Sequence, residues 1–454
     1  MSLTPYDTIE ALIHIAATNH LAQTELLRDL KEGRSVAPHP EDNISLGTLE
    51  FLAATGHGKI GANGFSLSDD SYLLDDRAAS SAKAFISWLD GFVGLYWESR
   101  GFPDLVHRLG NFPMAIGSAF QTEEVIPPFK GALSAIAFAL MNHGANESRP
   151  DLVNDPLQQI NYFLQHGNGN LESILASLIW DGHISNGREL TETGRQLAIR
   201  SGQAHLTTSY VPVFVGLPTA ARGVRNYDVL QPANAIASNA LIGPFVVPRI
   251  ISVVGEHASE NRNRVTLIDL GSGGGQVIRQ LYANLSDQYK VTVVGFDKNR
   301  DANRQASKMF DPSEIDKSVY FVKGDMLCRE DMRRLLITYR PDMITINYLL
   351  HDIGTKNIAS FLANLRNDCW KLGLNPLLVI SESYRPTPAQ LRTNPNFRYF
   401  VALHDWSGQS MMPRHMLHEL LRNGSYEIKR SIPIVQRGSD VYNEVVVAKM
   451  APKV

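Results

Sequence analysis

A glycine-rich turn follows an apolar segment that carries an aspartate. Residues 265–270 are largely apolar, include Asp269, and lead directly into Gly271, Gly273 and Gly275. A helical pattern begins directly after the last glycine. Because glycine has no side chain, such a turn between a strand and a helix lets the backbone approach a bound ligand closely. The pattern therefore predicts that this turn binds part of a cofactor.

Two further apolar segments end in acidic residues that suit a nucleoside cofactor. Segment 291–296 precedes Asp297, which lies 26 residues after Gly271. An acidic residue at this distance can accept both hydroxyls of a ribose. Segment 319–322 leads to Asp325, whose carboxylate is placed to receive an adenine amino group.

A fourth apolar segment, 343–347, ends in Asn347 and opens onto the face where the carboxyl ends of the strands meet. Met326, after the third segment, is expected at the same face. Each of these residues alone could be a turn glycine or a solvated polar residue. Four apolar segments that each end near a glycine, an acidic residue or an amide together favour a cofactor site.

The set resembles the class I S-adenosylmethionine-dependent methyltransferases, and so does the tail of the chain. The tail has an apolar segment that ends at Glu382, a helical pattern over 413–423 and two strand patterns over 426–435 and 442–449. The resemblance implies a Rossmann-like α/β domain that binds S-adenosylmethionine through the residues Asp269, Gly271, Gly273, Gly275, Asp297, Asp325, Met326 and Asn347. A dinucleotide dehydrogenase is the rival interpretation of the glycine turn. The aspartate before the glycines, the Gly-Asp pair and the paired closing strands favour S-adenosylmethionine.

A His-Asp pair, His351 and Asp352, follows the fourth segment. Together with a winged-helix-like region ahead of the catalytic domain, it resembles the small-molecule O-methyltransferases of plant and bacterial secondary metabolism. The resemblance implies that His351 takes the proton from the acceptor hydroxyl. The usual tryptophan at the next position is Ile353 here, and the resemblance spans about residues 165 to 450.

A second His-Asp pair, His404 and Asp405, lies 53 residues further on. Two imidazoles with neighbouring carboxylates can hold a divalent metal that keeps open positions. This arrangement resembles the metal-dependent methyltransferases that act on the β-carbon of α-keto acids such as phenylpyruvate or 2-ketoarginine. The resemblance implies an iron ion held by His351 and His404, with Asp352 as orienting group or base. Such an ion would stabilise the enolate of a chelated keto acid.

Two interpretations of these histidines remain open. In the alternative, the enzyme is a metal-free O-methyltransferase with His351 as general base, and His404 is an ordinary pocket or surface histidine. His415 and His418 stand three residues apart on an expected helix, and we expect them to be solvated.

The length of 454 residues exceeds what one hydrophobic core organises. We expect a helical region with a degenerate winged helix over 1–150, a winged-helix and dimerisation region with linker helices over 151–240, and the methyltransferase domain over 241–454. The blocks 58–68 and 182–191 both read Gly-x-Ile, Asn-Gly and Leu-Ser/Thr, which is consistent with an internal duplication.

Composition narrows the range of partners. Lys and Arg number 43 against 46 Asp and Glu, without a basic run, which argues against nucleic acid as a partner. Two cysteines offer no disulfide framework and no Cys-based zinc site, so we expect a reducing cytoplasm. An export signal and an apolar span of about 18 residues are also missing from the sequence, which argues against a membrane. A small-molecule substrate and a homodimer are expected from the resemblance.

Overall fold

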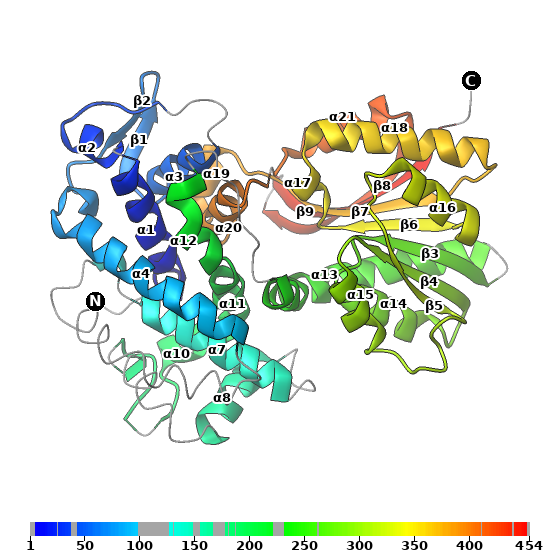
Figure 1. Cartoon of the computed structure of the whole chain (residues 1–454), viewed down its shortest axis with the longest axis horizontal. Helices are drawn as coiled ribbons and strands as arrows, with labels where there is room; N and C mark the ends of the chain where they lie inside the picture. The colour runs from blue at the N-terminus through cyan, green and yellow to red at the C-terminus, as the bar shows by residue number, and fades with distance from the viewer. Residues whose placement is uncertain are drawn as a thin grey trace. The chain divides into compact units, whose positions relative to one another are not determined.

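The computed structural model divides the chain into two compact units (Figure 1). The first comprises Met1–Leu241 with Thr387–Gly408, and the second Ile242–Pro386 with Gln409–Val454. The residues that the structure describes are 5–24, 26–37, 43–98, 127–129, 131–148, 155–166, 178–179, 181–186, 188–220, 231–260, 263–409, 411–437 and 440–451.

The first unit is mainly helical. Its elements are α1 (Pro5–Gln23), α2 (Leu26–Lys31), α3 (Asn43–Ala54), β1 (Gly58–Gly61), β2 (Gly64–Leu67), η1 (Tyr72–Leu74), α4 (Arg77–Glu98), η2 (Pro127–Phe129), α7 (Ala132–Ser148), α8 (Pro156–His166), α10 (Glu192–Ile199), α11 (Ser201–Ser209), α12 (Val211–Ala220), α19 (Pro388–Thr393) and α20 (Pro395–Trp406). Helix α1 is buried from Ile9 to Leu21 and packs against α4, α7 and α12, so it forms the centre of this unit.

The first of the two similar blocks forms a β-hairpin. Strands β1 and β2 pair antiparallel, with Gly64 at a φ of 107°, where a Cβ atom would lie 2.4 Å from the carbonyl oxygen of Val36. In the second block, Ile184 and Leu190 form a single antiparallel bridge. The winged-helix interpretation and the duplication both stay predictions.

Helix α20 packs in the core of the first unit, although in the sequence it follows five strands of the large sheet of the second unit. Trp406 at its end is fully buried and donates through Nε1 to the Thr48 hydroxyl at 3.0 Å. Gly47 of α3 lies so close that a Cβ atom there would be 2.7 Å from the Cβ atom of Asp405. The close approach of two helix backbones explains why a glycine stands at this position.

The second unit is built on a seven-stranded sheet with the order β5-β4-β3-β6-β7-β9-β8. Its strands are β3 (Arg264–Leu270), β4 (Lys290–Asp297), β5 (Val319–Lys323), β6 (Met343–Asn347), β7 (Leu377–Ser383), β8 (Tyr426–Arg437) and β9 (Asp440–Met450). Its helices are α13 (Gln231–Glu260, which begins before the unit boundary), α14 (Gln276–Leu285), α15 (Arg300–Ser307), α16 (Arg329–Tyr339), α17 (Leu350–Ile353), α18 (Thr355–Lys371) and α21 (Arg414–Asn423).

Strands β3 to β7 run parallel, whereas β9 pairs antiparallel with both β7 and β8. The parallel strands are almost continuously apolar because helices cover both faces of the sheet. Helices α16, α18 and α21 pack on one face, and α13 and α14 on the other (Figure 1). The predicted Rossmann-like α/β fold is confirmed. The strand order reverses between β3 and β6, the place where open α/β sheets bind ligands.

Within the described segments, no helix is both long enough and apolar enough to cross a membrane.

Candidate active site

The glycine turn lies at the carboxyl end of β3, directly at the point where the strand order reverses. Gly271, Gly273 and Gly275 have φ values of 71°, 52° and 77°, which side chains other than glycine rarely adopt. A Cβ atom on Gly271 would lie 2.5 Å from the Leu349 side chain, whereas one on Gly273 would meet open space. The turn is therefore packed against Leu349 on one side and accessible at Gly273.

Asp297, at the end of β4, is tied to this turn. Its Oδ2 accepts a hydrogen bond from the Gly273 amide at 2.9 Å, and its Oδ1 accepts one from the Asn299 amide at 2.7 Å. Each carboxylate oxygen has a second lone pair. The carboxylate can thus hold the turn in place and still accept the two hydroxyls of a ribose.

Asp269 is buried inside the sheet, with 2% of its surface exposed. Its Oδ1 accepts hydrogen bonds from the Thr345 hydroxyl at 2.7 Å and the Asn347 amide at 2.9 Å. Burial, opposed by these hydrogen bonds and helped by the charge of Asp297, raises the pKa of Asp269 to about 7. Its observed contacts therefore orient Asn347 across the point of strand reversal.

Three buried polar atoms surround the glycine turn without a hydrogen-bond partner among the described residues. They are Ser272 Oγ, Asn303 Oδ1 and Asn347 Oδ1, from the turn, α15 and the end of β6. Enclosed polar atoms are normally satisfied, so such a group of atoms indicates a polar ligand. The arrangement fits a nucleoside cofactor that carries hydroxyl and amino groups.

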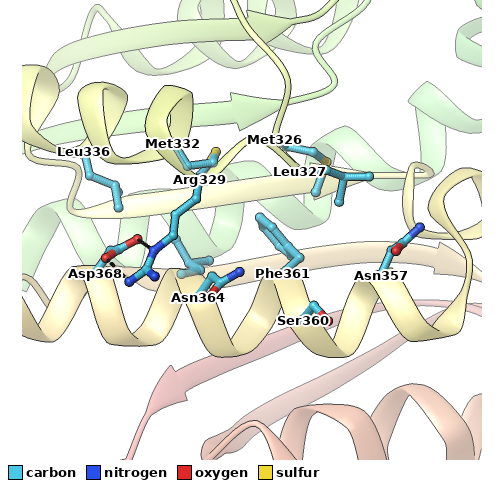
Figure 2. Close-up of a pocket in the computed structure, with 11 residues that line it drawn as sticks. Met326, Leu327, Arg329, Met332, Leu336, Asn357, Ser360, Phe361, Asn364 and Asp368 are labelled. Carbon is cyan, nitrogen blue, oxygen red and sulfur yellow. Dashed lines mark hydrogen bonds and ion pairs between the residues drawn. The ribbon is translucent and has the colours of Figure 1, made fainter.

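Asp325 and Met326 follow β5. Asp325 is exposed, and its Oδ1 accepts the Leu327 amide at 2.9 Å within the turn. Met326 is buried and lies at one end of a groove of about 470 Å³, open to solvent, between α16 and α18 (Figure 2). At the other end of this groove, Arg329 donates to Asp368 through Nε at 3.0 Å and Nη2 at 2.9 Å.

His351 in the short helix α17 pairs with a carboxylate from the neighbouring strand β7. Its Nδ1 lies 2.8 Å from Oε1 of Glu382, whose side chain is fully buried. Glu382 also accepts the backbone amides of Leu350 at 3.0 Å and Ser383 at 2.8 Å. Burial lowers the pKa of His351, but the charge and hydrogen bond of Glu382 and the charge of Asp352 together raise it to about 9. The pair fixes the orientation of the ring, with Nε2 on the side away from Glu382.

Asp352 has a different role from Glu382. Its Oδ1 lies 3.5 Å from His351 Nε2 and accepts a hydrogen bond from the Gln409 amide. Burial and the Glu382 charge raise its pKa, against the His351 and Lys298 charges and the Gln409 hydrogen bond. The predicted catalytic residues His351 and Asp352 thus lie in contact, at the carboxyl ends of β6 and β7.

His404 belongs to the first unit, whereas His351 belongs to the second. The His404 side chain is buried, and its Nδ1 lies 2.7 Å from the Phe400 carbonyl oxygen one turn earlier in α20. The Phe400 and Tyr210 rings pack beside it, with centroids at 4.1 and 6.2 Å. Across the described segments, no group of three or more His, Cys, Asp or Glu side chains is arranged to hold a metal. The metal shared by His351 and His404 stays a prediction.

The expectation that His418 is solvated is wrong. Its Nε2 lies 2.6 Å from Oε1 of Glu444, a fully buried carboxylate in β9 that also binds Arg414 at 2.9 Å. The Tyr384 hydroxyl donates to the same carboxylate at 2.6 Å. His415, one turn away, is exposed as expected. His418 therefore helps to fasten α21 to the β8-β9 pair.

Glu382 is the member of the candidate site whose contact with His351 the sequence analysis missed. The sequence identifies it only as the acidic end of a strand. In the parallel sheet, Asn347 of β6 pairs with Ser381 of β7, so the residue after Ser381 lies beside the segment that follows β6. The available indication was an acidic residue at the end of β7, the strand beside the one that precedes His351.

Comparison with known proteins gave structural likenesses only. No protein-family model matches the sequence, and no curated protein sequence matches it. Mitomycin 7-O-methyltransferase MmcR is similar at 13% identity and a TM-score of 0.46, over 74% of this chain and 100% of that one. An O-methyltransferase family 2 protein from Planctomyces limnophilus, in complex with apigenin, is similar at 11% identity and a TM-score of 0.41, over 99% and 97% of the two chains. The pyocyanin biosynthetic protein PhzM is similar at 13% identity and a TM-score of 0.40, over 74% and 100%.

Proposed function

We propose that the chain is an S-adenosylmethionine-dependent methyltransferase that acts on a small molecule. The observation that carries this proposal is the arrangement at one edge of the sheet. A glycine turn is held by Asp297 at the point of strand reversal, and the His351–Glu382 pair follows the two adjacent strands. Bound S-adenosylmethionine would supply an electrophilic methyl group on a positively charged sulfur.

His351 would act as the general base for an acceptor hydroxyl. The Glu382 carboxylate holds Nδ1 and stabilises the positive charge that the ring gains when Nε2 takes a proton. His351 must first be neutral, although its pKa is about 9 in the unliganded protein. A cation bound nearby disfavours the imidazolium and lowers this pKa. The base would therefore become active when the cofactor is bound.

The test is a transfer assay with S-adenosylmethionine labelled at its methyl group. Purified protein is incubated with a panel of phenols and α-keto acids, and the label in the acceptor is counted. Activity on a hydroxyl acceptor in the presence of a chelator supports His351 as general base. The absence of transfer to every acceptor, together with the absence of cofactor binding, contradicts the proposal.

We propose C-methylation of an α-keto acid on a metal as the second candidate. The observation that favours it is the Glu382 contact, because metal-bound histidines commonly give their other nitrogen to a carboxylate. Elemental analysis of the purified protein tests it. About one equivalent of iron or another divalent metal, lost in His404→Ala together with keto-acid methylation, supports this candidate. Metal-free protein that methylates a hydroxyl acceptor at full rate refutes it.

We further propose that the chain forms the homodimer expected from the resemblance. Light scattering of the full chain at micromolar concentration measures its mass directly. Twice the chain mass of 50.3 kDa is expected, and a single chain mass would contradict the dimer.

A further inference from the structure

A short connection joins the candidate cofactor site to the candidate base. Residues 348–350 are all that separate Asn347, at the end of β6, from His351 in α17. Asn347 is held by Asp269 beside the glycine turn, and His351 is held by Glu382. The residues of the connection therefore determine where the base lies relative to a bound cofactor.

Tyr348 and Leu349, in this connection, pack against opposite faces of the sheet. Tyr348 has a φ of 50°, a left-handed conformation that residues other than glycine rarely adopt. Its amide donates to the Ser381 carbonyl at 2.8 Å, and its side chain packs against the core beneath α13 and α14. The Leu349 side chain packs against the core beneath α16 and α18. The connection is thus held from both faces, which fixes the place of Leu349.

Leu349 fills the space beside the glycine turn that a side chain at position 271 would need. A Cβ atom on Gly271 would lie 2.5, 3.0 and 3.1 Å from the Cδ2, Cδ1 and Cγ atoms of Leu349. The turn is fixed at this point, because the Gly271 amide donates to the Phe296 carbonyl at 2.8 Å. A Cβ atom on Gly273 would meet nothing within 4 Å. The close packing is therefore at Gly271, and the turn is open at Gly273.

Leu349 also begins the helix that carries the base. It is the N-cap residue of α17, a helix of 4 residues without a side-chain cap. Its carbonyl accepts the Asp352 amide at 3.0 Å, and the Leu350 amide donates to Oε2 of Glu382 at 3.0 Å. So short a helix is not stable on its own in water. The position of α17 therefore depends on Leu349 at the glycine turn and on Glu382 at β7.

We propose that Leu349 is a positioning residue, whose packing on Gly271 sets the place of His351 relative to the bound cofactor. This inference rests on the proposed function, because it concerns the base and the cofactor of the same transfer reaction. Methyl transfer requires the acceptor to be deprotonated in line with the methyl group, so the distance between base and cofactor matters directly. Leu349 has no group that takes part in the chemistry and acts through His351 alone.

Steady-state kinetics at saturating S-adenosylmethionine test the inference, with the best hydroxyl acceptor from the transfer assay. Leu349→Ala should lower kcat by about 10- to 100-fold, the scale of loss for a catalytic group displaced by about 1 Å. Calorimetry should show S-adenosylmethionine affinity within about threefold of the wild type, because no polar contact is lost. Leu349→Met keeps the side-chain volume and should keep kcat within about threefold.

A double-mutant cycle tests the contact itself. Gly271→Ala adds the methyl group that meets Leu349, so it should lower kcat less in the Leu349→Ala background than in the wild type. The double variant should lose at least about fivefold less kcat than the product of the two single losses. Gly273→Ala is the matched control, because it has the same left-handed strain but its methyl group meets open space. Its loss should multiply with that of Leu349→Ala.

A further measurement needs no acceptor. The NMR signals of the His351 ring are followed while S-adenosylhomocysteine is added to the full chain. They should shift in the wild type and shift less in Leu349→Ala, in which the link to the turn is broken. Leu372→Ala removes another partly buried leucine from the same core, at the end of α18. It should lower the melting temperature without changing either the NMR shift or kcat.

Three results overturn the inference. One is a kcat of Leu349→Ala equal to that of the wild type. Another is full multiplication of the Gly271→Ala and Leu349→Ala losses. The third is a loss of S-adenosylmethionine affinity in Leu349→Ala as large as its loss of kcat, which assigns Leu349 to cofactor binding. Where no acceptor of the panel is methylated, an unchanged NMR shift in Leu349→Ala overturns the inference by itself. Failure of the wild-type protein to bind S-adenosylhomocysteine contradicts the proposed function instead.

Discussion

The two His-Asp pairs of the chain have the same sequence and different surroundings. His351 meets a buried carboxylate from the neighbouring strand, and its pKa rises to about 9. His404 meets a backbone carbonyl of its own helix and the rings of Phe400 and Tyr210. The aspartate next in sequence adds a smaller contribution to the pKa of His351 than Glu382 does. What distinguishes a candidate base from a packed histidine is the group that the fold brings to Nδ1.

Removing each imidazole is the strongest way to break this comparison. His351→Ala should reduce methyl transfer by about 10²- to 10⁴-fold, the usual contribution of a general base. His404→Ala should leave transfer near the wild-type rate and lower the free energy of unfolding by about 1–3 kcal/mol, because a buried hydrogen bond is lost. Transfer assays and denaturant titrations measure the two effects. Equal losses of transfer in both variants would show that both histidines serve the reaction, as the metal hypothesis requires.

Glu382→Gln sharpens the comparison by removing the charge and keeping the shape. We expect transfer to fall by about 10- to 100-fold, as for other groups that orient a functional histidine. Burial then acts without the opposing carboxylate, so the pKa of His351 should fall. An NMR titration of the His351 ring measures this shift, and an unchanged pKa would contradict the assigned pairing.

The same pair has a consequence for stability. The folded protein favours the imidazolium of His351, so its contribution is fully present below the ordinary pKa of 6.5 and is lost as the pH rises through about 9. Denaturant titrations across this window should show falling stability in the wild type and a smaller fall in Glu382→Gln. Parallel curves for the two proteins would argue against a charged His351.

The aspartates should give the smallest effects. Asp352 is 39% exposed and lies 3.5 Å from His351, so Asp352→Asn should lower transfer by no more than about fivefold, the range of an exposed ion pair. Asp405 is buried against α3, and Asp405→Asn should affect stability alone. A loss of transfer with Asp405→Asn at unchanged stability would contradict this assignment.

The strands and the glycine turn were predictable because their determinants are local. Each strand is a buried apolar run, and Gly271 and Asp297 stand directly at strand ends. The placement of residues 387–408 was not predictable. These residues lie in the sequence between segments of the sheet domain, but Trp406 and Leu403 are buried in the core of the helical unit. An apolar helix does not specify which core it joins.

The pairings between side chains were equally out of reach of sequence reasoning. Glu382 meets His351 and Glu444 meets His418 only because strands distant in the chain become neighbours. Residue types identified the candidate base, and the sheet order supplied its partner.

The central claim is that the glycine turn and Asp297 bind S-adenosylmethionine. Calorimetric titration of S-adenosylmethionine into the wild type and Asp297→Ala tests it most directly. The wild type should bind one equivalent. The variant should lose about 1.5–3 kcal/mol of binding free energy, because hydrogen bonds to a charged group disappear. Equal affinities in the two proteins, or no binding by the wild type, would contradict the account.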